Sequence, residues 1–274
     1  MLHSKKWLVA IGFSALGACV LVTAPSARAE DDGTSGGDAS SAQAKETKTE
    51  VPVTAFTYAG GGVSKGSYGA MATGLGVGGK GADSVVGGGG TIWGSPIDRL
   101  TIIGDAQRNV VGNFAPSALA MVRLFGKVGD GLAISALGKF KIDGFAVGPN
   151  KEVEAEIESG LAVSYNKAGW HADVNGIGGV GTGDDREVDA EARLRLGRDI
   201  ADSVRLGVDG QARYRLHGTF MLPGDRKGDF FVGPQVLVGA SHFFGAITAG
   251  PTTMGLATSG VGYMAVVSVG GVSF

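Results

Sequence analysis

The feature that most constrains the fold is a long alternation of charged and apolar residues over residues 187–216. The polar positions are Glu187, Asp189, Glu191, Arg193 and Arg195 in the first half and Arg205, Asp209, Gln211, Arg213 and Arg215 in the second. Apolar residues such as Leu194 and Val208 lie between them. Side chains of a β-strand point alternately to opposite faces, so each half predicts a strand with one charged face and one apolar face. The stretch therefore predicts a β-hairpin.

The two strands of this hairpin are unusually long. They cover residues 187–197 and 204–217, whereas a strand of a globular protein typically has about five or six residues. A strand that crosses a bilayer at a tilt needs about nine to eleven residues. We therefore interpret the hairpin as part of a transmembrane β-barrel, in which the apolar residues face lipid and the charged residues face the lumen.

The N-terminus predicts a signal peptide over residues 1–29. Lys5 and Lys6 precede an apolar run, residues 7–22, and residues 26–29 end in an A-x-A pattern. This layout predicts export and cleavage before Glu30. The single cysteine, Cys19, ends a four-residue stretch that resembles a bacterial lipoprotein box, although the residues after it stay apolar. Cleavage after Ala29 would leave the mature chain without cysteine and so without disulfides.

Residues 30–66 predict a flexible acidic lead-in to the barrel. Residues 30–50 contain no apolar side chain larger than that of alanine, a composition typical of a linker. Residues 51–58 alternate only weakly, so that either an extra strand or a plug-like segment fits them. Whether residues 30–66 occupy the lumen or bind a periplasmic partner stays open.

Residues 67–274 predict an all-β, antiparallel, up-and-down transmembrane barrel of about twelve strands, with ten as the alternative. The first two of these segments carry the weakest alternation. The expected strands are residues 67–78, 84–93, 98–108, 116–125, 132–143, 152–165, 170–180, 187–197, 204–217, 229–240, 243–250 and 258–274.

The connections between these segments alternate in length. Those at residues 94–97, 126–131, 166–169, 198–203 and 241–242 are short, and most of those between them are longer. Outer-membrane barrels have short periplasmic turns and longer extracellular loops. With an even number of strands, the pattern predicts that both ends of the barrel chain lie in the periplasm.

Aromatic residues and the last strand support this orientation. Tyr165 and Trp170 flank the turn at 166–169 with the parity of the apolar face, which predicts an interfacial aromatic girdle. The alternative is cross-strand aromatic packing in a soluble sheet. The chain ends at Phe274, after a glycine- and valine-rich strand.

A terminal phenylalanine that closes an amphipathic last strand resembles the C-terminal signal of bacterial outer-membrane β-barrel proteins. Val272 fills the second aromatic position of that signal, so the match is loose. The resemblance extends over the signal peptide and residues 67–274, and it points to no narrower family. It implies residence in the outer membrane, contact with its lipid, and recognition of the strand ending in Phe274 by the barrel-assembly machinery.

The positions on the charged face of each alternating strand predict a ladder of residues that face the lumen. They are Lys139, Lys141, Glu152, Glu154, Glu156, Glu158, Asp173, Glu187, Asp189, Glu191, Arg193, Arg195, Arg205, Asp209, Arg213 and Arg215. Several acids on one face repel each other unless basic neighbours compensate. We expect the cross-strand pairs Lys141–Glu154, Lys139–Glu156, Arg193–Asp209, Asp189–Arg213 and Glu187–Arg215.

The charges of the lumen and the width of the barrel affect which ions could pass and whether a pore is open. Acidic residues outnumber basic ones in the expected lumen, which predicts that an open pore would favour cations. Eight strands leave a filled interior and 16 to 18 leave an aqueous channel. A barrel of about twelve strands lies between these limits, so a narrow pore and a filled lumen both remain possible.

The sequence thus predicts a narrow porin-like channel or a structural membrane barrel, without a cofactor or a bound metal. A soluble secreted β-barrel that binds a small apolar ligand is the alternative, with the apolar face inward. A less favoured third interpretation is an outer-membrane hydrolase centred on His217, near Asp225 and Asp229. His171 and Asp173 share a face but would need further ligands to hold a metal. Removal of the signal peptide takes away Lys5, Lys6 and Arg28 and leaves 21 of the 24 basic residues against 26 acidic ones, a balance that gives no reason to expect nucleic-acid binding.

Overall fold

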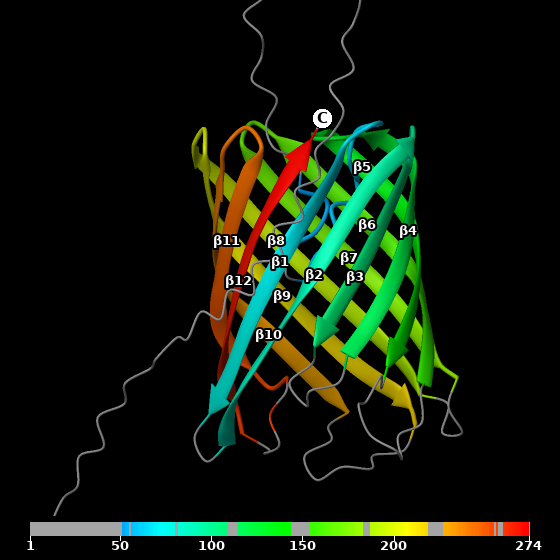
Figure 1. Cartoon of the computed structure of the whole chain (residues 1–274), viewed down its shortest axis with the longest axis vertical. Helices are drawn as coiled ribbons and strands as arrows, with labels where there is room; N and C mark the ends of the chain where they lie inside the picture. Colours follow the sequence, from blue (N-terminus) through cyan, green and yellow to red (C-terminus); the bar gives the residue numbers. More distant parts are fainter. Residues whose placement is uncertain are drawn as a thin grey trace, which may run out of the picture. The chain divides into compact units, whose positions relative to one another are not determined.

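Twelve antiparallel strands close into a barrel in the computed structural model of the chain (Figure 1). The structure describes residues 51–54, 56–79, 82–108, 114–143, 154–182, 187–218, 227–254, 256 and 260–273. The strands are β1 (Tyr68–Gly79), β2 (Ala82–Ile97), β3 (Leu100–Arg108), β4 (Phe114–Lys127), β5 (Asp130–Asp143), β6 (Glu154–Lys167), β7 (Trp170–Gly181), β8 (Val188–Ala201), β9 (Val204–His217), β10 (Gly228–Gly239), β11 (Phe243–Thr252) and β12 (Gly262–Ser273).

Each strand pairs with its neighbours in sequence, and β1 pairs with β12 to close the barrel. The closing register runs from Tyr68 opposite Ser273 to Gly78 opposite Tyr263. The predicted twelve-stranded, up-and-down antiparallel barrel is therefore confirmed. Closure leaves no strand edge exposed, so every strand can satisfy its backbone groups within the wall. No helix among the described residues is long and apolar enough to cross a membrane.

Short turns gather at the rim where β1 begins and β12 ends. They lie at residues 98–99, 128–129, 168–169, 202–203 and 240–242. At the β6–β7 turn, Ala168 and Gly169 have φ values of 52° and 79°, the pair of positive angles that a type I′ hairpin turn requires. The predicted alternation of connection lengths holds, apart from the short β1–β2 connection at the opposite rim.

One predicted turn is wrong. Residues 94–97 belong to β2, and the chain reverses at 98–99 instead. The lead-in to the barrel explains the extension: Gly66 N–H donates to the carbonyl of Ser95, and Ser95 N–H donates to the carbonyl of Ser67. Backbone pairing with residues 66–67 thus keeps the end of β2 extended.

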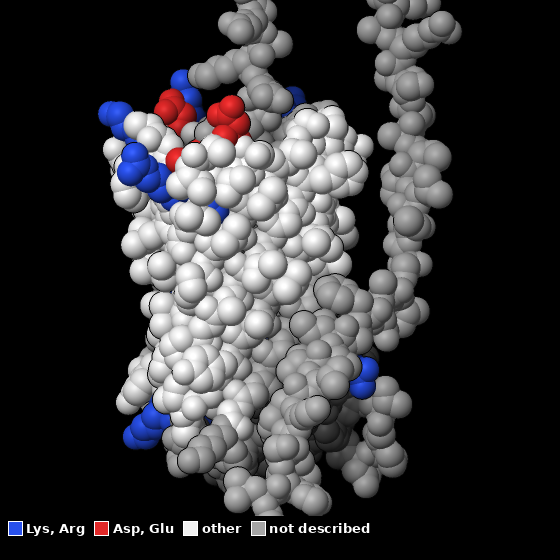
Figure 2. Space-filling model, turned by 90° about the vertical axis from the view of Figure 1, so that its left-hand side faces the viewer, with Lys and Arg blue, Asp and Glu red and all other residues white. Residues whose placement is uncertain are grey.

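In the charged strands, most charged side chains point into the barrel and the apolar ones between them point out. On β8, Arg193 is 9% exposed and Arg195 4%, whereas Leu194 between them is 41% exposed. On the outer face shown in Figure 2, charged residues lie only near the two ends of the barrel, with an uncharged band between them. The alternative of a soluble barrel with its apolar face inward is wrong, because the charges face the lumen.

Exposed aromatic side chains lie near both rims. Those at the rim of the short turns are Tyr68, Phe125, Tyr165, Trp170 and Phe243, and those toward the other rim are Phe114, Phe140, Tyr214, Phe230 and Tyr263. Tyr165 stands opposite Ala172 rather than opposite another aromatic residue, which argues against cross-strand aromatic packing at this turn. The Arg198 guanidinium lies 5.1 Å from the centre of the Trp170 ring.

Candidate functional site in the barrel lumen

The inner face of β5 to β9 carries a set of ion pairs. Lys139 Nζ lies 3.2 Å from Glu158 Oε1, and Lys141 Nζ lies 3.1 Å from Glu156 Oε2. Further pairs join Asp173 to Arg195, Glu191 to Arg193, Asp199 to Arg205, Asp189 to Arg213 and Glu187 to Arg215. Each opposite charge offsets part of the desolvation that its partner suffers inside the barrel. The sequence-predicted lumen residues described by the structure are thus neutralised largely in pairs.

The predicted register between β5 and β6 is wrong by two residues. Lys139 stands opposite Glu158 and Lys141 opposite Glu156, in place of Glu156 and Glu154. The prediction began the second strand at residue 152, whereas β6 begins at Glu154, and the predicted lumen residue Glu152 lies outside the described residues. A slip of two residues keeps every side chain on its face, so alternation alone could not detect it.

The register of the β8–β9 hairpin also differs from the prediction by two residues, but two of its predicted ion pairs still form. Asp189 stands opposite Arg215, yet its carboxylate bonds diagonally to Arg213, as predicted. The predicted pair of Glu187 with Arg215 also forms, at 3.2 Å. Diagonal neighbours on a sheet are within reach of long side chains, which explains why these two pairs survive the slip.

The third predicted pair of this hairpin, Arg193 with Asp209, is wrong. Arg193 stands opposite Gln211 and binds Glu191, whereas Asp209 stands opposite Arg195. The carboxylate of Asp209 is instead occupied by the segment that precedes the barrel.

That segment, residues 51–66, enters the lumen, and we call it the plug. Val53 and Tyr58 form an isolated antiparallel bridge, so the plug begins as a small hairpin. The Thr54 hydroxyl donates to Asp209 Oδ2 at 2.9 Å and the Thr57 hydroxyl donates to Asp209 Oδ1 at 2.8 Å. Of the two alternatives for residues 51–58, the structure therefore shows the plug-like one.

Side chains from the charged wall also hold the plug through its backbone. Tyr58 exchanges two hydrogen bonds with Asn175, each 2.8 Å long. Arg193 donates to the carbonyl of Phe56 at 2.8 Å, and its guanidinium lies 4.8 Å from the centre of the Tyr58 ring. This arginine thus joins the ion-pair set to the plug.

Close approach to β6 requires a glycine at position 60. Gly60 N–H donates to the Ser164 hydroxyl, and its carbonyl accepts from the Ser135 hydroxyl. A Cβ atom at this position would lie 2.6 Å from the carbonyl oxygen of Ala162, well inside van der Waals contact. The small side chains of Ser135, Ala162 and Ser164 leave the space that the plug fills.

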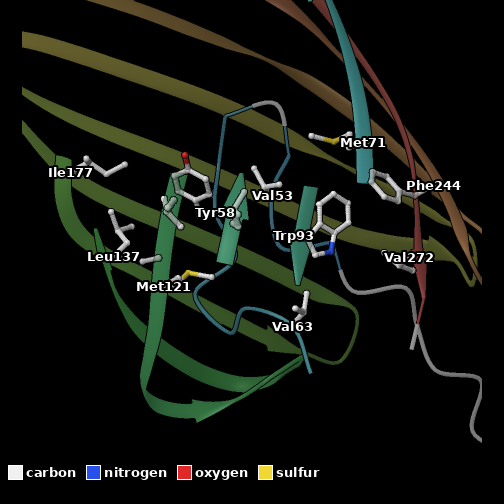
Figure 3. Packing of buried hydrophobic residues seen from close by; sticks show 13 residues of the cluster. Val53, Tyr58, Val63, Met71, Trp93, Met121, Leu137, Ile177, Phe244 and Val272 are labelled. Carbon is white, nitrogen blue, oxygen red and sulfur yellow. The ribbon is translucent and has the colours of Figure 1, made fainter. Parts of the chain in front are cut away.

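The plug also packs against apolar side chains from strands around the barrel (Figure 3). Val53, Tyr58 and Val63 are buried in one cluster with side chains from the surrounding strands. The wall members of this cluster are Met71, Trp93, Ile103, Leu119, Met121, Leu137, Ala162, Ile177, Phe244 and Val272. Burial of this apolar surface, at about 25 cal/mol per Å², adds to the hydrogen bonds that fix the plug.

A cavity of about 390 Å³ lies between the plug and the inner wall. Its charged lining residues come mainly from β5, β6, β8 and β9, and β3 adds Asp105 and Arg108. Uncharged polar residues such as Thr73, Thr91 and Ser117 come from β1, β2 and β4. The apolar lining residues come largely from β1, β12, the β11–β12 connection and the plug. In strand order, β1 and β12 lie on the far side of the barrel from β6 and β7. The cavity therefore has two chemically different sides.

The histidines have separate surroundings. His171 lies 2.7 Å from Asn166 Oδ1 and 3.0 Å from Asp199 Oδ2, whereas Asp173 binds Arg195. Among the described residues, no group of three or more His, Cys, Asp or Glu is placed to hold a metal ion.

Of the three residues proposed for hydrolysis, His217 and Asp229 are described, and the structure does not bring them together. Asp229 of β10 stands opposite Arg213 of β9, four positions from His217, and its carboxylate accepts from the Thr253 hydroxyl. Asp225 lies outside the described residues.

Comparison with known proteins shows which class of proteins shares this fold. No protein-family model matches the chain, and no curated protein matches it. Among solved structures, the NanC porin is similar with a TM-score of 0.57 and 6% identity, over 73% of this chain and 98% of that one. An outer membrane channel from Pseudomonas putida F1 is similar with a TM-score of 0.54 and 11% identity, over 82% of this chain and 100% of that one. The chain has the fold of the bacterial outer-membrane β-barrel proteins.

Proposed function

We propose that the protein is a narrow outer-membrane channel, closed by its plug in the conformation described here. The observation that carries this proposal is the cavity of about 390 Å³ beside the plug, lined by ion-paired side chains. A purely structural barrel of this width could fill its interior with side chains. Here a separate segment, held by hydrogen bonds and apolar contacts with the wall, occupies part of the lumen.

The outer face supports the membrane location. The uncharged band in Figure 2 suits lipid, and the aromatic side chains near both rims, Tyr165 and Trp170 among them, suit the two interfaces. We propose that the chain reaches this membrane by export with a cleaved signal peptide. The barrel-assembly machinery would recognise its last strand, β12, and the rim of the short turns would face the periplasm.

Selectivity in this channel would be weak. The charged residues that line the cavity are the acids Asp105, Glu156, Glu158, Asp189 and Glu191 and the bases Arg108, Lys139, Lys141, Arg193 and Arg213. The acidic surplus expected from the sequence does not extend to the lining of the cavity, where the two signs balance. We therefore propose a slight preference at most, set by charges outside the cavity.

We propose a role without catalysis. The solved structures cited above are described as a porin and a channel, and His217 and Asp229 are separated as described. Lipid or peptide hydrolysis by the purified protein that is lost in His217→Ala would support the enzymatic hypothesis, and the absence of hydrolysis would remove it.

Conductance in planar bilayers tests the channel. The plug is held by Thr54 and Thr57, so Thr54→Val/Thr57→Val, with isosteric side chains, removes two hydroxyl donors to Asp209 without altering the wall. Hydrogen bonds to a charged group contribute about 1.5–3 kcal/mol each, so we expect open probability to rise at least about tenfold over the original chain.

Lys65→Ala is the control, because Lys65 is an exposed residue at the end of the plug. It should leave open probability unchanged. If the double valine variant is folded and inserted yet passes no current, the channel proposal fails and the protein is a structural barrel.

A further inference from the structure

We propose that the cavity beside the plug binds a small zwitterion with an apolar body, of the kind that an apolar amino acid represents. The proposal deepens the channel function by naming the class of solute. It rests on the contrast between the two sides of the cavity.

The apolar side is unusual for the lumen of a membrane barrel. Barrel interiors are normally polar, and β-strands of outer-membrane proteins alternate apolar outside with polar inside. In β1, however, Met71, Leu75 and Val77 face the lumen with Thr73 as the one polar residue among them, and Met264 and Val266 of β12 continue this surface. Apolar side chains that line a cavity gain free energy when an apolar ligand displaces water from them.

Three methionines make this side adaptable. Met71, Met254 and Met264 line the cavity together with Phe56 of the plug. Methionine is unbranched and polarisable, and it fits apolar ligands of different shape, including the edges of aromatic rings. The apolar side is therefore suited to a class of side chains rather than to one shape.

The polar side presents both signs of charge at short spacing. Lys139 and Lys141 alternate with Glu156 and Glu158 across the β5–β6 pair, and Arg213 binds Asp189. A ligand with a single charge would meet as many repulsive as attractive groups on this surface. A zwitterion can place each of its charges against an opposite one, because the ladder offers neighbouring ammonium or guanidinium groups and carboxylates.

The size of the cavity limits the ligand. Its volume of about 390 Å³ lies near the lower end of ligand pockets, which hold about 300–1,000 Å³. A single small amphipathic molecule fits this volume.

The test is equilibrium binding measured by saturation-transfer NMR, with the full mature chain folded in lipid nanodiscs. The probe is L-phenylalanine. Glycine has the same zwitterionic head without the apolar body, and 3-phenylpropionate and phenethylamine have the ring with one charge each. We expect saturable binding of L-phenylalanine, at least about tenfold weaker binding of either singly charged probe, and no saturable signal from glycine.

Variants of both sides complete the test. Leu75→Gln should weaken L-phenylalanine binding about tenfold, and Lys141→Gln should weaken it while bringing its affinity closer to that of phenethylamine. If Leu75→Gln does not fold, Val266→Thr replaces it, since threonine has nearly the same shape as valine. Lys65→Gln, outside the cavity, should bind as the original chain does.

Equal signals from glycine and L-phenylalanine, or undiminished binding by folded Leu75→Gln, would show that the apolar side does not contribute to binding. Equal affinity for all three ring-bearing probes would overturn the zwitterionic preference. Binding by a barrel that passes no current would instead refute the channel function and leave the site intact. Conductance without binding of L-phenylalanine would refute the binding site and leave the channel function intact.

Discussion

Asn175 holds Tyr58 by two hydrogen bonds that imitate strand pairing. The N–H of Tyr58 donates to Asn175 Oδ1, and Asn175 Nδ2 donates to the carbonyl of Tyr58, both at 2.8 Å. A side-chain amide on β7 thus satisfies both backbone groups of a residue that lies 117 positions earlier in the chain. Because these groups are buried, their satisfaction decides how firmly the plug is seated.

The first prediction follows from this contact. Asn175→Ala leaves the Tyr58 N–H and carbonyl without these partners, at a cost of about 1–3 kcal/mol for each buried group. We expect the plug to leave its seat more often. A cysteine introduced at Val53, which is buried in the plug, reports this movement through its reaction with a water-soluble maleimide.

In the Asn175→Ala background we expect Val53→Cys to react at least about tenfold faster than in the original background. Lys65→Cys, exposed in both backgrounds, serves as the reference for reagent access. Equal protection of the Val53 cysteine in the two backgrounds would show that Asn175 does not hold the plug.

The second prediction concerns a cross-link between plug and wall. A Cβ atom built at Gly62 would lie 3.4 Å from Cβ of Thr101, close to the separation of about 3.5–4.5 Å found in disulfides. We expect Gly62→Cys/Thr101→Cys to form a disulfide on mild oxidation, visible as a shift in gel mobility that a reductant reverses.

Gly66→Cys/Thr101→Cys is the matched control for this cross-link. Gly66 has φ of 84° and Gly62 has φ of 65°, so both cysteines accept the same left-handed backbone. A Cβ atom at Gly66 would have nothing within 4 Å. Efficient cross-linking of the control pair would mean that the end of the plug is not seated as described.

The third prediction concerns the lipid-facing band. Leu194 lies near the middle of β8, and Leu216 lies near the end of β9 toward the rim of the longer connections. An arginine on the lipid face costs about 2–4 kcal/mol at the bilayer midplane and about 0–1 kcal/mol near the interface. We expect Leu194→Arg to lower the free energy of unfolding by the larger amount and Leu216→Arg by the smaller.

Urea unfolding of the barrel in lipid vesicles, followed by tryptophan fluorescence, measures both variants. Similar losses at the two positions would contradict the placement of the membrane across the middle of β8.

The fourth prediction concerns the buried pair of Lys139 and Glu158. Lys139→Met leaves the Glu158 carboxylate buried without its ammonium partner, and breaking a buried pair in this way costs about 3–5 kcal/mol. Lys139→Met/Glu158→Leu removes both charges, and we expect it to regain most of the lost stability. A double-mutant cycle on the free energy of unfolding gives the coupling. Additive losses would indicate that the two side chains do not interact.

Faces could be predicted from the sequence because they depend on local alternation alone. Arg193 points inward and Leu194 outward whichever strand lies beside them. Register was less accessible, since a shift of two residues changes the partner of Lys139 from Glu156 to Glu158 without moving any side chain to the other face. The alternation within each strand is the same for both pairings, so it cannot distinguish between them.

The plug could not be placed from the sequence for a different reason. Its anchors Asn175 and Asp209 have the parity of any lumen residue, and nothing local links them to Tyr58 or Thr57. One feature of the sequence does indicate the plug: the inward-facing residues Ser135 of β5 and Ala162 and Ser164 of β6 are small and leave room inside the wall. An inward strand face that lacks long side chains at one level indicates that another part of the chain fills that level.

The plug also has a consequence for the order of assembly. Thr54 reaches its partner Asp209 across 155 positions of sequence, and that partner lies on the ninth strand of the wall. The plug contacts therefore cannot be completed until most of the strands are in place. We therefore expect the plug, although it precedes the barrel in the sequence, to take its final position as a late step of assembly.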